Sequence, residues 1–264
     1  MTTPKNRYRM LAVLCAAMAV AACEKNAVQV LPNEPLLSAR IKFFNFGVSA
    51  PGVNFYADAT KMTAIQSGTG SEATTGVAYG GVGNGGAYSQ LAPGSHALTG
   101  RIAAATDKDR AIATVNATIA DDKLYSFYMS GIYNTTTKTS DGFVVEDPIP
   151  TTIDYSTAYV RFVNAISNAS PLTLFATIRN AVDTTKIDTI SVNAAVAYKS
   201  AGGFTTLTGG IYNLFARYTD STTNKVSRTA VTFLGGRVYT IGARGDITVA
   251  TGGNAPALDN TANR

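Results

Sequence analysis

Four short blocks of this sequence occur twice and in the same order. Residues 39–45 match residues 158–164, and each block ends in an asparagine. The three later pairs are 77–79 with 196–198, 88–94 with 204–210, and 123–127 with 237–241. Chance similarity between two stretches rich in Thr, Ala and Gly would not keep this order. The sequence therefore predicts an internal duplication.

The repeated blocks have the character of β-strands. In residues 40–43 and 159–162 outward-type and inward-type side chains alternate, which is the period of a half-buried strand. Residues 121–122 and 235–236 are turn-forming pairs that stand just before such strands. Short strands with frequent turn signals predict an all-β fold, organised as two tandem immunoglobulin-like β-sandwich domains.

The first 23 residues have the pattern of an export signal. Three basic residues precede a run of 13 apolar residues, 10–22, and small residues lie directly before Cys23. The run is too short to span a bilayer of about 30 Å. This stretch resembles a bacterial lipoprotein signal, and the resemblance implies that cleavage falls before Cys23 and that a diacylglycerol is attached to it. We therefore expect an exported, lipid-anchored protein of the cell envelope, at the outer membrane or cell surface rather than the inner membrane.

Removing the signal changes the charge and the cysteine count. The chain has 22 Lys and Arg against 17 Asp and Glu, and three of the basic residues lie in the signal, which leaves 19 against 17. Such a balance gives no reason to expect a nucleic-acid partner. Cys15 is lost with the signal and Cys23 carries the lipid, so the mature chain is expected to have no disulfide and no cysteine-based metal or catalytic site.

Prolines and composition set the expected boundaries. Two prolines fall in a tether before the first strand, and two more stiffen a linker between the repeats. The last residues contain almost no large apolar side chain, which predicts disorder. The expected parts are a signal peptide at 1–22, a tether at 23–37, a first sandwich at 38–146, a linker at 147–157, a second sandwich at 158–250, and a disordered tail at 251–264.

The blocks of the first repeat also carry a family resemblance. They are residues 41–45, 49–51, 53–56, 77–80 and 88–94, with weaker counterparts at 160–164 and 170–175. Together they resemble the bacterial domain-of-unknown-function family numbered 4397, which is typical of secreted proteins and lipoproteins. The resemblance implies a β-sandwich in an envelope setting, and it brings no established activity or catalytic residues. Asn54 and Thr173 stand where the family usually has an acidic residue.

The residue types that often carry chemistry are sparse. His96 is the single histidine, and its counterpart in the second repeat is Tyr212, which favours a packed strand position over a catalytic or zinc site. The acidic pairs 107/109 and 121/122 lie in predicted hairpin turns, where Asp is common, although they also allow a carboxylate pair or a weak calcium site. Residues 81–86 fit a glycine-rich nucleotide pattern, but no helix is predicted after them. No catalytic residue, cofactor or metal site is predicted.

Four tyrosines are the remaining binding candidates. Tyr79, Tyr88, Tyr133 and Tyr212 lie at or near predicted loop ends, where exposed aromatic rings can stack on sugars. The alternative is ordinary packing in sheets and core, to which the absence of Trp adds weight.

These observations lead to three function hypotheses. The first is a lipid-anchored, non-catalytic structural or interaction module that contacts an envelope protein or a glycan. The second is a carbohydrate-binding surface lipoprotein. The third is a hydrolase that uses a carboxylate pair across two loops.

Overall fold

The structure is a computed structural model, and it describes residues 39–63, 75–179 and 189–264. The predicted signal peptide, Cys23 and the tether lie outside the described residues. Among the residues that are described, no helix is long and apolar enough to cross a membrane.

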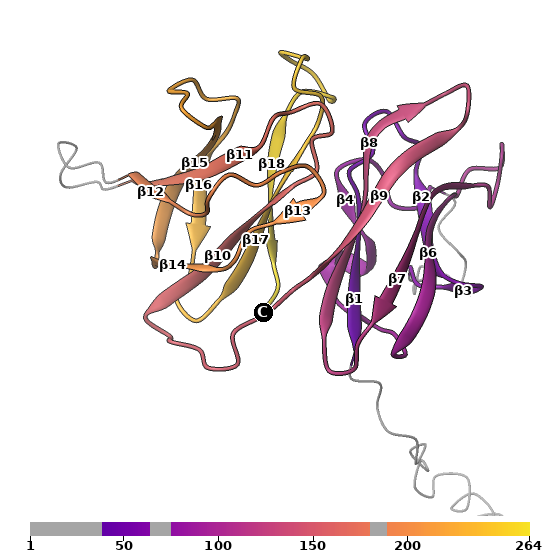
Figure 1. The fold of residues 1–264 in the computed structure, drawn as a ribbon, viewed down its shortest axis with the longest axis horizontal. Helices are drawn as coiled ribbons and strands as arrows, with labels where there is room; N and C mark the ends of the chain where they lie inside the picture. Colours follow the sequence, from indigo (N-terminus) through magenta and orange to yellow (C-terminus); the bar gives the residue numbers. More distant parts are fainter. Residues whose placement is uncertain (1–38, 64–74, 180–188) are drawn as a thin grey trace, which may run out of the picture. The chain divides into compact units, whose positions relative to one another are not determined.

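The first half of the chain forms two sheets, which make up the first sandwich (Figure 1). One sheet has the order β4-β1-β8-β9, with β5 also pairing with β1, and the other has the order β3-β2-β6-β7. The strands are β1 (Arg40–Asn45), β2 (Val53–Ala57), β3 (Thr60–Lys61), β4 (Gly81–Val82), β5 (Ser89–Gln90), β6 (Gly94–Ile102), β7 (Ala111–Ile119), β8 (Leu124–Asn134) and β9 (Thr139–Glu146). A short 3-10 turn, η2 (Gly83–Gly86), follows β4.

The second half repeats this plan strand for strand and makes up the second sandwich. Its sheets have the orders β13-β10-β17-β18, with β14 also pairing with β10, and β12-β11-β15-β16. The strands are β10 (Thr157–Asn164), β11 (Leu172–Ile178), β12 (Thr189–Ser191), β13 (Ser200–Ala201), β14 (Thr205–Thr208), β15 (Gly210–Tyr218), β16 (Val226–Phe233), β17 (Val238–Arg244) and β18 (Ala257–Ala262). In both halves the first strand runs parallel to the eighth strand of its half, β1 to β8 and β10 to β17. The predicted all-β class with two sandwich domains is confirmed.

Each sandwich has its own apolar core. Phe43, Phe55 and Phe127 pack together in the first core, with ring centroids 5.3 to 6.3 Å apart. The second core is built mainly from aliphatic side chains such as Leu174 and Leu214, together with Phe233. In β11 and β15 buried positions alternate with more exposed ones, as expected for sheets that face the core on one side.

A third apolar cluster lies between the two sandwiches. It joins Phe44, Phe46 and Tyr128 of the first sandwich to Val163 and Ala165 of the second. The sheets of β1 and β10 are therefore covered on both faces. The predicted half-buried alternation is wrong at these two strands, because the side chains that point away from one sandwich are buried against the other.

The C-terminal tail differs from its prediction as well. The predicted disordered segment 251–264 contains β18, which pairs with β17 along its whole length. Only Leu258 of this strand reaches the core. The other residues of β18 are held in place by backbone hydrogen bonds to β17. Such bonds do not require apolar side chains, so the composition of the segment did not indicate a strand.

Candidate functional site

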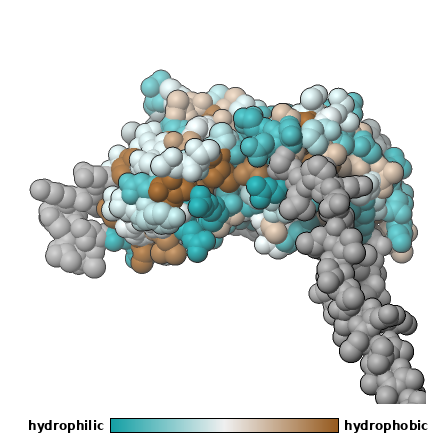
Figure 2. All heavy atoms as spheres, turned by 90° about the horizontal axis from the view of Figure 1, so that it is seen from below, coloured by the Kyte–Doolittle hydropathy of each residue, from teal (hydrophilic) through white to brown (hydrophobic). Residues whose placement is uncertain are grey.

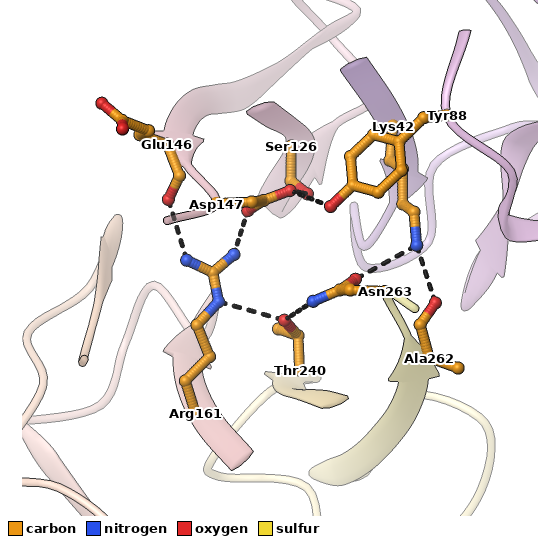
Figure 3. A network of polar contacts seen from close by, with 9 residues as sticks. All are labelled: Lys42, Tyr88, Ser126, Glu146, Asp147, Arg161, Thr240, Ala262 and Asn263. Atoms are coloured by element: carbon orange, nitrogen blue, oxygen red, sulfur yellow. Dashed lines mark hydrogen bonds and ion pairs between the residues drawn. The ribbon is translucent and has the colours of Figure 1, made fainter. Parts of the chain in front are cut away.

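The most unusual group of side chains in the structure is a buried polar network between the two sandwiches (Figure 3). Its centre is formed by Lys42 of β1 and Arg161 of β10, whose side chains are each about 1 % exposed. They hold the same place in the two halves, since Lys42 lies beside Ser126 in β8 and Arg161 lies beside Thr240 in β17. A charge in such a place is costly unless other groups partner it.

Arg161 reaches out of the second sandwich to the end of β9 in the first. Its Nη1 donates to the carbonyl oxygen of Glu146 at 2.8 Å, and its Nη2 forms an ion pair with Asp147. Its Nε donates to Thr240 Oγ1 at 3.0 Å. The Asp147 side chain is fully buried, so this is a desolvated ion pair that depends on its further hydrogen bonds.

The first sandwich supplies those further hydrogen bonds. Ser126 Oγ and the Tyr88 hydroxyl both donate to Asp147 Oδ2 at 2.7 Å. Burial raises the pKa of Tyr88, and the negative charge of Asp147 raises it further. Tyr88 therefore stays a neutral donor, and both carboxylate oxygens of Asp147 are satisfied.

Lys42 crosses the interface in the opposite direction, from the first sandwich to the end of β18. We call each of these contacts, that of Arg161 and that of Lys42, a crossing. Its Nζ donates to the carbonyl oxygen of Ala262 at 2.8 Å and to Asn263 Oδ1 at 3.1 Å, and lies 4.4 Å from the centre of the Tyr88 ring. Desolvation lowers the pKa of Lys42 to about 8, with a smaller lowering from Arg161, while Asp147 acts in the opposite direction. The lysine is the least well compensated charge in the network.

The two crossings are related by a local two-fold pattern. Glu146 pairs with Tyr125 and Ala262 pairs with Tyr239, so the ends of β9 and β18 are counterparts. Each basic side chain thus binds the same backbone carbonyl and the next side chain of the other sandwich. The aromatic partners match too, because the Arg161 guanidinium lies 5.1 Å from the centre of the Phe204 ring and Lys42 Nζ lies 4.4 Å from that of Tyr88. This is the geometry of a self-complementary dimer interface within one chain.

The apolar part of the interface places large side chains against small ones. Phe44, Tyr128 and Phe143 stack in a row on the first sandwich, with ring centroids 4.5 and 5.1 Å apart. The second sandwich has Gly242 opposite, where an added Cβ would lie only 2.7 Å from the Phe46 ring. The close approach of β17 to this ring therefore requires glycine.

Polar contacts continue at the far end of the interface. The Tyr198 hydroxyl lies 2.9 Å from both Ser130 Oγ and Asp141 Oδ2, and Lys199 forms an ion pair with Asp141 at 3.2 Å. Asn254 Nδ2 donates to Ser49 Oγ at 2.9 Å. The two sandwiches are thus joined at both ends of β1 and β10 as well as in the middle.

The four predicted binding tyrosines do not share one face. The Tyr88 ring lies inside the polar network, and Tyr79 lies 4.7 Å from the Arg244 guanidinium. Tyr133 packs against the first core. Tyr212 is 1 % exposed in the second core, and its hydroxyl donates to the Thr208 carbonyl at 2.7 Å. Two of them therefore serve the interface and two serve the cores.

His96 is held by two contacts. Its Nδ1 lies 2.8 Å from Asp58 Oδ2, and its Nε2 lies 2.8 Å from the carbonyl oxygen of Ala92. The second contact matches that of Tyr212, whose hydroxyl also binds the carbonyl four residues earlier. This equivalence supports the interpretation of His96 as a packed strand residue.

The acidic pairs adopt turn geometry. Asp107, Asp109 and Asp122 have positive φ values of 58°, 62° and 56°, a conformation in which Asp is common at tight turns. Asp107 also forms an ion pair with Lys138. Over the described ranges, no three His, Cys, Asp or Glu residues lie close enough together to hold a metal ion.

The residues of the polar network are not among the predicted site residues. Asp147 lies in the predicted linker and Asn263 in the predicted tail, while the alternation predicts Lys42 and Arg161 to be outward-facing strand residues. One signal is present in the repeats, namely a basic residue at the same position of two matching blocks.

The fold and this interface define a double β-sandwich protein whose halves are locked face to face. Comparison with known protein families matches residues 39–175 to the domain of unknown function DUF4397, and the chain belongs to this family. The match covers the first sandwich, the connection and the beginning of the second sandwich as far as β11. No curated protein matches the chain.

Proposed function

We propose that this chain is a lipid-anchored protein of the bacterial cell envelope and acts as a non-catalytic structural or interaction module. The observation that carries the proposal is the signal-like N-terminus, in which small residues and Cys23 follow a short apolar run. The buried network adds support, because its charged groups bind one another across the two sandwiches and hold them in one arrangement.

The proposal includes a second copy of the family domain, formed by β10 to β18. The support is the matching strand order of the two halves and two buried asparagines at the ends of β1 and β10. Asn45 Nδ2 donates to the Val77 carbonyl at 2.8 Å, and Asn164 Nδ2 donates to the Val196 carbonyl at 3.0 Å. A repeated side chain that makes the same buried bond fits duplication of one domain.

Replacement of the lipidated cysteine tests the anchor. We expect Cys23→Ser to abolish incorporation of a labelled fatty acid and to move the protein from the membrane fraction to the soluble fraction. Cys15→Ser is the matched control, since Cys15 lies in the segment that is cleaved off, and it should leave both properties unchanged. A Cys23→Ser protein that is still acylated and membrane-bound would refute the proposal.

A further inference from the structure

Exposed apolar side chains gather at one end of the second sandwich. Within the described ranges, four large apolar side chains are exposed: Ile132 at 48 %, Tyr155 at 77 %, Ile211 at 45 % and Leu234 at 56 %. Leu234 and Ile211 follow Phe233 and Gly210, which are paired in the ladder between β15 and β16. Tyr155 lies against the turn that follows Leu234, since a Cβ on Gly236 would be 2.7 Å from its ring. Figure 2 views the molecule from this end, and hydrophobic surface is visible there.

The same end of the first sandwich has a different character. Ala120, Asp121 and Asp122 occupy the turn that corresponds to Leu234 and the two glycines after it. The two turns are equivalent in structure, because the Tyr125 hydroxyl accepts from the Ala120 N–H as the Tyr239 hydroxyl accepts from the Leu234 N–H. This turn is thus acidic in the first sandwich and apolar and uncharged in the second.

This apolar end lies on the side where the N-terminal segment joins the fold. Arg40, the first residue of β1, donates its backbone N–H to the Lys123 carbonyl. In the second sandwich Gly236, in the turn after Leu234, donates its N–H to the carbonyl of Thr157 at the beginning of β10. The hydrogen bonds of Lys42 and Arg161 join β1 to the end of β18 and β10 to the end of β9. From Cys23 to Arg40 the chain spans at most about 60 Å when fully extended.

We propose that this end of the second sandwich rests on the lipid bilayer that holds the anchor. The proposal depends on the proposed lipid attachment at Cys23. Leu234 and Ile211 supply apolar contact, and Tyr155 has the amphipathic ring that favours the headgroup level. Arg179 and Arg237 are exposed beside them and suit anionic headgroups.

The anchor explains how so small a patch suffices. Three side chains bind a bilayer only weakly when the protein is free in solution. A lipid attached through a short segment keeps the patch close to the surface, so that a weak contact becomes effectively intramolecular. The contact would fix the orientation of both sandwiches on the membrane rather than supply the binding itself.

The absence of tryptophan in the chain allows a direct test. The lipidated full chain with Leu234→Trp is reconstituted in vesicles of phosphatidylethanolamine and phosphatidylglycerol, with and without brominated acyl chains. The matched control is Ile132→Trp, a similarly exposed apolar position at the opposite end, where Ile132 bridges to Val48 beyond the end of β1. We expect brominated lipid to quench about half of the Leu234→Trp emission and to leave the Ile132→Trp emission unchanged.

The outcomes separate this contact from the anchor. If mass spectrometry finds no diacylglycerol on the protein and the protein does not float with vesicles, both the lipid anchor and the proposed membrane contact are refuted. Lipidated, vesicle-bound protein with equal quenching at both positions refutes the contact alone. A blue shift of the Leu234→Trp emission that grows with protein concentration in the absence of vesicles overturns it in favour of a second copy of the chain.

Discussion

At the position where the first sandwich has Tyr128, the second has Gly242, because these residues lie beside Phe44 and Val163 in corresponding ladders. The same contrast recurs at Phe46 and Ala165, each the second residue after those ladder positions. Large side chains on both sandwiches at this close approach would clash, and small ones on both would leave a gap. In the apolar part of the interface, large side chains of the first sandwich therefore face small ones of the second.

The polar half of the interface shows a second contrast. Arg161 forms an ion pair with the carboxylate of Asp147, whereas Lys42 donates its hydrogen bonds to the carbonyl oxygen of Ala262 and the amide oxygen of Asn263. One crossing is a charge-compensated ion pair, and the other is a buried ammonium bound to neutral oxygens. The two halves of the network should therefore respond differently to the same substitution.

The two crossings should differ most in the loss of stability when Arg161 and Lys42 are replaced one at a time. Arg161→Met leaves the buried carboxylate of Asp147 without its counter-charge and should lower the free energy of unfolding by about 3 kcal/mol. Lys42→Met removes a poorly compensated charge and should cost about 1 kcal/mol or less. Urea unfolding at neutral pH measures both values.

A double variant gives the control for this comparison. Combining Arg161→Met with Asp147→Asn removes the unpaired charge, so it should recover much of the lost stability. Equal losses for Arg161→Met and Lys42→Met would show that the two crossings do not differ as the structure indicates.

The sequence predicted the fold well and the network poorly, for physical reasons that differ between residues. The repeated asparagines, Asn45 and Asn164, lie in blocks whose alternation and order are local features, and such features survive in the sequence. Lys42 and Arg161 follow the same alternation, but their burial arises from a contact between parts far apart in the chain. In the tail, β18 is held by its backbone ladder, which leaves no periodic apolar pattern to read.

The buried ammonium group of Lys42 should also make the stability depend on pH. The pKa of Lys42 falls from 10.5 to about 8 on folding, so between these values the unfolded chain binds more protons and the free energy of unfolding rises with pH. The raised pKa values of Tyr88 and Tyr128 act in the opposite direction above about pH 10. From pH 8 to pH 9 we expect a rise of about 1 kcal/mol.

The matched variant for this titration is Lys42→Met. It should lose the rise between pH 8 and pH 9, because methionine has no titrating group. Urea unfolding at several pH values gives the two profiles. Parallel profiles for the native chain and Lys42→Met would place the titrating group elsewhere.

The smallest effect is expected where the two halves are most alike. His96 and Tyr212 are counterparts, and each binds the carbonyl oxygen of the residue four positions earlier. His96→Tyr therefore places the second sandwich's own residue in the first sandwich. The substitution removes the exposed contact between His96 and Asp58. The other carboxylate oxygen of Asp58 still accepts a hydrogen bond from the Ala97 N–H.

We expect His96→Tyr to shift the thermal midpoint by no more than about 2 °C, because it keeps the carbonyl contact and replaces one ring with another. His96→Ala removes both the ring and the contact, so it should lower the midpoint further. Calorimetry of the two variants measures the difference. If His96→Tyr were as damaging as His96→Ala, the tyrosine would not fit the site, and the equivalence of the two positions would fail.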